Sequence, residues 1–326
     1  MAVRLHRIAE KITEILIYFI IIFSSWAFGS TELWSSWIIN ASAFALGIIL
    51  VAKWAIRSKI NFNVCKNLNQ KELSIKQRRL SFVKNTCNIL IAFSIGLLLA
   101  YILTSAINAR ASFSINTKEY TYFNTFNPSI PHTYDARATW LIFWQYLGLM
   151  LLFYSARDWI VGAKYFEQTI SINPRLKRLL YVVLINGGIL ALESIIQNLY
   201  YGEYQEGKLL FLVEPGINSL SEGQFGPFAY RSNACSYQNL LWPIGIGLFI
   251  QLGRENHEYK NKRIGLSSEL ILLPCIILSA SSSVISSSRG GSLVMLGLMI
   301  VCMCYVYTLN NRSNFIKFSI PISMLL

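Results

Sequence analysis

The stretch CNILIAFSIGLLLAYILTSAIN, residues 87–108, runs for 22 residues without a charged side chain. At about 1.5 Å per residue, a helix of this length spans roughly 33 Å, enough to cross the roughly 30 Å hydrocarbon core of a bilayer. A run of this kind is typical of a transmembrane helix. It therefore predicts that this part of the chain folds in lipid.

Seven more apolar runs of similar length accompany this one. Together they predict spans over residues 12–28, 33–52, 87–108, 139–155, 179–200, 234–252, 265–284 and 291–309. A ninth run begins near Phe318 and ends at Leu326, too short to cross a bilayer, so we expect this last span to be truncated. Hydrophobic residues make up 54% of the chain and charged residues 14%, whereas soluble domains carry about 25% charged residues. The sequence therefore predicts an all-α fold, a polytopic transmembrane helical bundle of about eight full spans in a single transmembrane domain, residues 1–326.

Lysine and arginine are distributed unevenly between the predicted spans. Of the 29 such residues, 23 fall before the first span or in alternate loops, including the basic loop 53–86. By the positive-inside rule these segments and the amino terminus are cytoplasmic, and the long loops 109–138 and 201–233 face outward. This topology accounts for the formal net charge of +13, so the charge does not call for a nucleic-acid partner.

Cysteine and acidic residues do not form a pattern typical of a cofactor or metal site. The six cysteines are scattered, most of them in apolar runs or on the predicted cytoplasmic side. We therefore expect neither structural disulfides nor zinc, and no cofactor.

The outer segment FGPFAYRSN, residues 225–233, leads directly into the predicted span 234–252. This places Arg231 at the outer end of the predicted helical bundle. A guanidinium group offers a planar fork of donors that suits phosphate or pyrophosphate oxygens. An arginine that extends to lipid headgroups explains the same position equally well.

The outer turn SSSRGGS, residues 286–292, carries the second candidate, Arg289. The glycines that follow, Gly290 and Gly291, allow a close turn and leave backbone amides open to an anion. Because a charge between two spans must reach water or headgroups, a functional role is the first hypothesis for Arg289.

These two segments carry a family resemblance. The stretch FGPFAYRSNACSYQNLLWP, residues 225–243, and the turn SSSRGGSL, residues 286–293, resemble the two signatures of the O-antigen ligase and O-antigen polymerase family. Arg231 and Arg289 are 58 positions apart, in the family's order and on one predicted side. The resemblance implies a multi-pass protein of the bacterial inner membrane that acts in lipopolysaccharide or other polysaccharide biosynthesis.

The resemblance also implies a reaction, a metal-independent glycosyl transfer on the outer face. A glycan would leave an undecaprenyl pyrophosphate-linked donor and join a lipid A-core or glycan acceptor, with membrane lipids as further partners. Arg231 and Arg289 would bind the pyrophosphate. Their neighbours would contribute to substrate binding: Tyr230, Asn233, Gly290 and Gly291.

The chain departs from the family in its histidines. Family members usually carry a catalytic histidine in a large outer loop beyond the point that corresponds to Leu326. In this chain His132, in the segment NPSIPHTYD, faces outward in the predicted topology and is the candidate base. A solvent-exposed loop histidine is the simpler explanation of His132. Asp135 and Arg137 beside it form either a salt bridge or a helix cap.

Two other functions remain open from the sequence. A small-anion transporter is the first, because Glu193 lies within a predicted span and Gly187, Gly188 and Pro243 could interrupt helices. The second is a non-catalytic component of surface-polysaccharide assembly. The sugar, the acceptor, the choice between ligation and polymerisation and the oligomeric state are not determined by the sequence.

Overall fold

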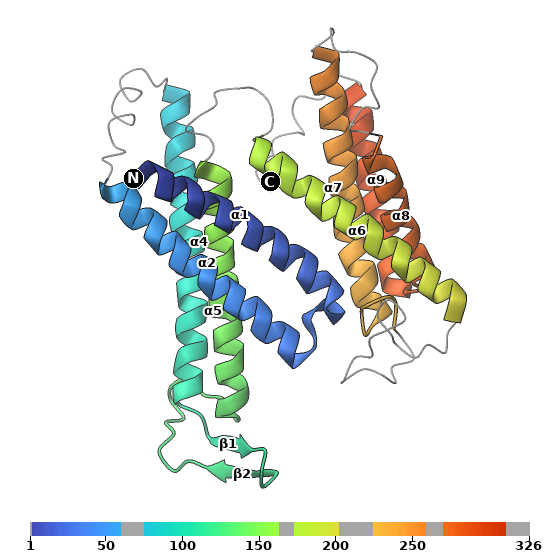
Figure 1. Cartoon of the computed structure of the whole chain (residues 1–326). Coiled ribbons are helices and arrows are strands. Elements are labelled where there is room, and N and C mark those ends of the chain that lie inside the picture. Colours follow the sequence, from blue (N-terminus) through green and yellow to red (C-terminus); the bar gives the residue numbers. More distant parts are fainter. Residues whose placement is uncertain (1, 60–74, 163–172, 202–223, 259–269, 311–326) are drawn as a thin grey trace. The chain divides into compact units, whose positions relative to one another are not determined.

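A computed structural model describes residues 2–59, 75–162, 173–201, 224–258 and 270–310. The elements named below belong to these residues. Most of them are helical, as the apolar runs predict (Figure 1). The helices are α1 Ala2–Trp26, α2 Leu33–Lys59, α4 Ile75–Ile107, α5 Ala136–Gly162, α6 Pro174–Tyr201, α7 Arg231–Glu258, α8 Leu272–Ile285 and α9 Arg289–Asn310.

Five of the described helices are long and apolar enough to cross a membrane. They are α2, α4, α5, α6 and α9. Of the remaining three, α1 carries more charged residues, α7 is less apolar, and α8 has 14 residues. Each of the eight predicted spans overlaps one of these helices. The chain is therefore a helical membrane protein by the length and composition of its helices.

The described residues form two compact units. The first comprises residues 1–20 and 36–165, and the second comprises residues 21–35 and 166–326, within the ranges described above. The first unit thus holds most of α1, α2, α4 and α5, and the second holds α6, α7, α8 and α9. The two units are described separately below.

Small residues allow close contact between helices in the first unit. A Cβ placed on Gly47 of α2 would lie 2.9 Å from Leu151 Cδ1 of α5, and one on Gly148 of α5 would lie 2.9 Å from Asn40 Oδ1 of α2. Small residues at such positions are typical of helix packing in membranes, where backbones must approach closely. The contact brings the central turns of α2 and α5 together.

Four charged residues of the first unit meet between α1, α2 and α5. Lys53, whose side chain is 1% exposed, places its Nζ 2.5 Å from Glu10 Oε1 and 2.8 Å from Asp158 Oδ2. Arg57 binds Asp158 through both ends of its fork, with Nη1 2.5 Å from Oδ1 and Nη2 3.0 Å from Oδ2. Two positive and two negative charges therefore compensate one another inside the unit, and we call this group the ion cluster.

His6 of α1 extends the ion cluster on one side. Its Nε2 accepts a hydrogen bond of 3.0 Å from Arg57 Nε. Burial lowers the pKa of His6, and the neighbouring charge of Arg57 lowers it further. The imidazole is therefore neutral near pH 7, as its role as an acceptor requires.

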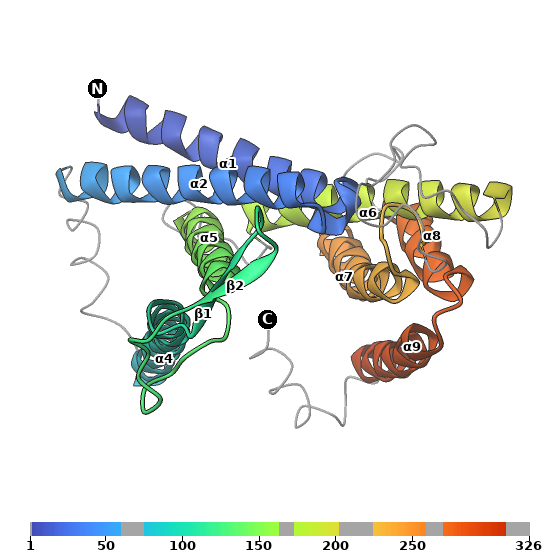
Figure 2. The same ribbon diagram turned by 90° about the horizontal axis from the view of Figure 1, so that it is seen from below.

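The link between α4 and α5 contains a two-stranded antiparallel hairpin that the all-α prediction did not include. Strand β1 is Ala111–Ser114 and strand β2 is Glu119–Tyr122, with Ala111 opposite Tyr122. Figure 2 shows this hairpin at the ends of α4 and α5. The strands carry aromatic residues that pack on one another across the pair, as Phe113 and Tyr120 do at 5.1 Å between ring centroids. Four-residue strands are too short for a clear period-two pattern, which explains why the sequence did not predict them.

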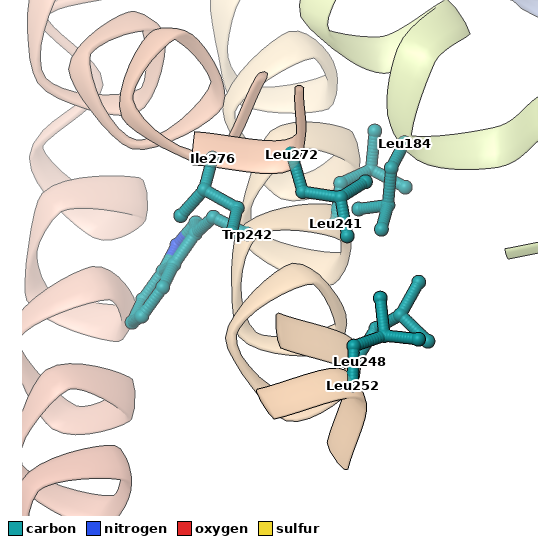
Figure 3. Packing of buried hydrophobic residues seen from close by; sticks show 7 residues of the cluster. All are labelled: Leu184, Leu241, Trp242, Leu248, Leu252, Leu272 and Ile276. Carbon is teal, nitrogen blue, oxygen red and sulfur yellow. The ribbon is translucent and has the colours of Figure 1, made fainter. Parts of the chain in front are cut away.

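The second unit has an apolar core between α6, α7 and α8, shown in Figure 3. It consists of Leu184, Leu241, Trp242, Leu248, Leu252, Leu272 and Ile276. Glycines bring the three backbones close: a Cβ on Gly188 would lie 2.9 Å from the Cα of Cys275, and one on Gly245 would lie 2.5 Å from Ile276 Cγ1. This packing fixes α6, α7 and α8 as one scaffold for the residues at their ends.

Candidate functional site

Arg231 and Arg289 are the first residues of two helices of the second unit. Arg231 begins α7 and Arg289 begins α9, and both side chains are exposed. Tyr230 precedes α7 with 58% of its surface exposed, and its carbonyl accepts a hydrogen bond of 2.9 Å from the backbone N–H of Asn233. The predicted residues around Arg231 therefore form the exposed first turn of α7.

The first turn of α9 is joined directly to the second and third turns of α7. Asn239 of α7 donates a hydrogen bond of 2.9 Å from Nδ2 to the carbonyl of Gly291 in α9. The carboxamide of Asn239 is held in turn by Trp242, whose Nε1 donates to Asn239 Oδ1 at 3.2 Å. One turn closer to Arg231, Cys235 packs against Gly291 so closely that a Cβ there would overlap its sulfur. These contacts hold the start of α9 against α7, one to two turns after Arg231.

The residues of the SSSRGGS turn have distinct roles. Ser288 stands directly before α9, and its Oγ accepts a hydrogen bond of 3.3 Å from the backbone N–H of Gly291. This is the pattern of a serine that caps a helix amino terminus. A Cβ on Gly290 would meet nothing within 4 Å, whereas Gly291 is the contact with α7. Gly290 therefore lies on the open side of α9 and Gly291 on the packed side.

The position of the two arginines along their helices follows from the contact at Gly291. Arg231 lies four residues before Cys235, about 6 Å along the helix axis, and Arg289 lies two residues before Gly291, about 3 Å. Both extend beyond the contact in the same direction, because α7 and α9 begin at the same end of the unit (Figure 1). Two exposed guanidinium groups thus stand beside two helix amino termini, whose partial positive charge also favours anions.

The segment before Arg231 is buried, which the prediction of an outer loop did not include. The residues 224–229 are all buried and fold into a tight turn in which Phe225 and Phe228 exchange backbone hydrogen bonds of 3.1 and 3.2 Å. Phe225 and Phe228 pack with Leu190 of α6 and Ala234 of α7. We call residues 224–229 the buried turn. It anchors the residue before Arg231 to two helices.

Gly226 at the tip of the buried turn has no room for a side chain. Its φ is +56°, a conformation that favours glycine. A Cβ there would overlap the hydroxyl of Ser194 and would lie 3.2 Å from Glu193 Oε2. The FGPF motif therefore encodes a turn that fits against α6. The glycine and proline of the motif were the sequence signals that could have indicated this turn.

Glu193 lies in α6 with 8% of its surface exposed, beside the buried turn. Under the transporter hypothesis, Glu193 would belong to a transport site built on interrupted helices. In the structure α6 continues without interruption through Gly187 and Gly188, and α7 continues through Pro243. These two helices therefore do not show the breaks that the transporter hypothesis expected of them.

His132 belongs to the first unit, in the segment between the hairpin and α5. Its Nε2 lies 2.6 Å from Arg110 Nη2, and its Nδ1 lies 3.1 Å from the carbonyl of Ile130. Since a guanidinium only donates, this pattern assigns the proton of the ring to Nδ1 and leaves Nε2 as the acceptor. Arg110 also stacks on Phe126, 4.9 Å from the ring centroid. Both nitrogens of His132 therefore have partners within the loop, and a role as base requires that one of them exchange its partner.

Asp135 and Arg137, the polar pair beside His132, form a helix cap. Asp135 Oδ1 accepts a hydrogen bond of 3.0 Å from the backbone N–H of Arg137, at the start of α5. The same oxygen accepts one of 3.3 Å from the backbone N–H of Phe113 in β1. Of the two interpretations that the sequence left open, the geometry matches the cap. It joins the hairpin to α5.

The described residues do not contain a group of three or more histidine, cysteine and acidic side chains that could hold a metal ion. The five cysteines among them, Cys87, Cys235, Cys275, Cys302 and Cys304, are free thiols. Cys65 lies outside the described residues. Among the described residues, the starts of α7 and α9 carry the exposed cations Arg231 and Arg289, whose guanidinium groups suit an anion.

The contact at Gly291 gives a direct test of the packing between α7 and α9. We expect Gly291→Ala to lower the free energy of unfolding by roughly 1–3 kcal/mol, the usual cost of inserting a methyl group into a packed contact. Gly290→Ala is the matched control, since its methyl group would enter open space in a helix and should leave stability equal or higher. The measurement is thermal unfolding of the purified protein in detergent. Equal melting temperatures for the two variants would show that α7 and α9 do not meet at Gly291.

Comparison with known proteins finds no family model that matches the chain. No curated protein and no solved structure matches it either. The chemistry of the site therefore follows from its own residues.

Proposed function

We propose that the chain transfers a glycan from an undecaprenyl pyrophosphate-linked donor to a glycan or lipid A-core acceptor on the outer face of the bacterial inner membrane. In this proposal Arg231 and Arg289 bind the pyrophosphate. Tyr230, Asn233 and Gly290 surround it as substrate-binding residues, and Gly291, which the sequence also assigned to this set, holds α9 against α7. The resemblance of the two arginine segments to O-antigen ligases and polymerases supports the choice of substrate.

The observation that supports this function most strongly is the junction of α7 and α9. It brings two arginines that are 58 residues apart in sequence to the same end of one scaffold. Two guanidinium forks and two helix amino termini suit a pyrophosphate, which carries several negatively charged oxygens over a short distance. A single arginine that extends to a lipid headgroup does not require such a junction.

The proposed chemistry uses these charges on the leaving group. When the bond between the glycan and the pyrophosphate breaks, negative charge accumulates on the departing oxygen. Fixed cations beside that oxygen stabilise the transition state more than the ground state, which is what lowers the barrier. This step does not require a metal ion. Transfer of labelled glycan from purified lipid-linked donor by the reconstituted protein is the measurement that tests it.

The proposal requires that the arginines face outward, which we infer from the charge distribution. The inferred topology has eight full spans and a cytoplasmic amino terminus, so that α7 and α9 both begin at the outer surface. It is supported by the overlap of each predicted span with a helix and by the junction of the two helix starts at one end. The same topology places the ion cluster, near the ends of α1, α2 and α5, toward the cytoplasm.

Cysteine labelling in intact cells tests this topology. We expect a cysteine introduced at Ser221 to react with a membrane-impermeant thiol reagent and one introduced at Asn69 to be protected. Both positions lie outside the described residues, in the predicted outer loop 201–233 and the basic loop 53–86. Labelling after lysis is the control, because Asn69→Cys should then react as well. The opposite pattern in intact cells would place Arg231 and Arg289 on the cytoplasmic side and exclude the proposed function.

A further inference from the structure

The first turns of α1 present two different surfaces. On one side Glu10, Thr13 and Ile17 are buried, at 9%, 1% and 2% exposure. On another side Arg4, Arg7 and Lys11 are exposed. Their spacing of three and four residues aligns them in one row along the helix. The buried side packs into the first unit, and the cationic row, Arg4, Arg7 and Lys11, points away from it.

An apolar row lies beside the cationic row. Leu5, Ile8, Ile12 and Ile15 are 53%, 49%, 43% and 64% exposed. At 3.6 residues per turn these four side chains occupy the sector next to that of the three cations. An exposed apolar row bordered by cations has the pattern of a helix end at the headgroup boundary, which is where the predicted span 12–28 begins.

The ion cluster determines which side of α1 faces outward. Glu10 is held 2.5 Å from Lys53, and His6, one turn before it, is held 3.0 Å from Arg57. Rotation of α1 about its axis would separate Glu10 from the buried Lys53 and leave two cations, Lys53 and Arg57, with Asp158 alone, which is costly. The cationic row and the apolar row are therefore held on the exposed side of α1, away from the packed interior of the first unit.

We propose that the first three turns of α1 form a binding surface for the headgroups of anionic phospholipids. The apolar row would enter the boundary between headgroups and acyl chains, and Arg4, Arg7 and Lys11 would contact lipid phosphates beside it. Charge complementarity favours this partner, since three exposed cations beside an apolar row match an anionic lipid surface. A protein partner would have to cover the same apolar row with an acidic segment. The proposal depends on the chain residing in a membrane and is independent of glycan transfer.

Native mass spectrometry of the full chain in detergent tests this surface. The probes are phosphatidylglycerol and phosphatidylcholine with identical acyl chains. We expect the parent protein to bind phosphatidylglycerol more tightly, and the triple variant Arg4→Gln/Arg7→Gln/Lys11→Gln to lose most of this preference. Each basic residue near an anionic surface strengthens binding about fivefold, so the loss for three should be roughly ten- to a hundred-fold. Binding of phosphatidylcholine should be unchanged.

Two further variants serve as controls for the loss of lipid preference. Arg4→Lys/Arg7→Lys keeps the charges and should keep the preference for phosphatidylglycerol. Arg175→Gln/Lys177→Gln/Arg178→Gln removes three cations from the start of α6 and should also keep it. An unchanged preference in the α1 triple variant would overturn the proposal and leave a protein as the partner of this surface. Equal losses in both triple variants would also overturn it, because net charge alone would then control lipid binding.

Discussion

Replacement of Arg231 or Arg289 by alanine is expected to lower glycan transfer by about ten- to a hundred-fold or more. Each charge-assisted contact to a phosphate is worth roughly 1.5–3 kcal/mol, and about 1.4 kcal/mol corresponds to a factor of ten in rate. The measurement is transfer of glycan from purified lipid-linked donor by the full-length protein in reconstituted membranes. Arg137→Ala is the matched control, since Arg137 is also an exposed arginine at the start of a helix. It should transfer at the parent rate.

Three more variants test whether the two arginines form one pyrophosphate site. Lysine keeps the charge but lacks the fork of donors, so Arg231→Lys and Arg289→Lys should restore transfer only in part. If both arginines bind one pyrophosphate, the double alanine variant should be little worse than the worse single variant. Parent rates in both single alanine variants, at equal membrane levels, would instead mean that these side chains only extend to lipid headgroups.

The helices were predictable because their signal is continuous in the sequence. A run such as residues 87–108 needs no information about other parts of the chain, and α4 indeed covers it through Ile107. The starts of α7 and α9 were also marked locally, by Arg231 before an apolar run and by the serine and glycines around Arg289. Such local signals predict where helices lie in the sequence.

The contacts between helices were not predictable in the same way. Arg57 and Asp158 are 101 residues apart. In the sequence Arg57 contributed only to the count of basic residues in cytoplasmic loops, and Asp158 was not singled out. Cys235 was one of several scattered thiols, and its role became visible only when Gly291 was found against it. The pairing of such residues depends on which helix faces meet. A single sequence does not contain that information.

The buried turn shows a third case, in which composition was misleading. Residues 224–229 are rich in aromatic residues, glycine and proline and follow a long polar loop, so they were assigned to the outer loop. Phe225 and Phe228 are nevertheless 2% and 7% exposed. Two aromatic rings within a loop next to a span are large enough to prefer burial between helices, and Gly226 provides the required turn. This packing ties Arg231 to α6.

The ion cluster gives the second large effect, this time on stability. We expect Asp158→Asn to lower the free energy of unfolding by roughly 3 kcal/mol, the lower end of the cost of removing one partner of a buried ion pair. Lys53 and Arg57 would then share Glu10 alone, and the side chain of Lys53 is only 1% exposed. Arg57 limits the loss, because 26% of its side chain is exposed and can be hydrated. Thermal unfolding in detergent is the measurement, and Arg157→Gln, a charge next to Asp158 but outside the cluster, is the control.

A balanced variant separates charge compensation from simple loss of packing. Lys53→Met together with Glu10→Met removes one charge of each sign and leaves Arg57 bound to Asp158 by its two contacts of 2.5 and 3.0 Å. Replacing a buried ion pair with apolar side chains of similar volume is often neutral or stabilising. The double variant should therefore be clearly more stable than Asp158→Asn, although it changes two residues instead of one. If the double variant were less stable than Asp158→Asn, the shape and volume of Lys53 and Glu10 would hold α1, α2 and α5 together. Compensation among the four charges would then not be the cause of stability.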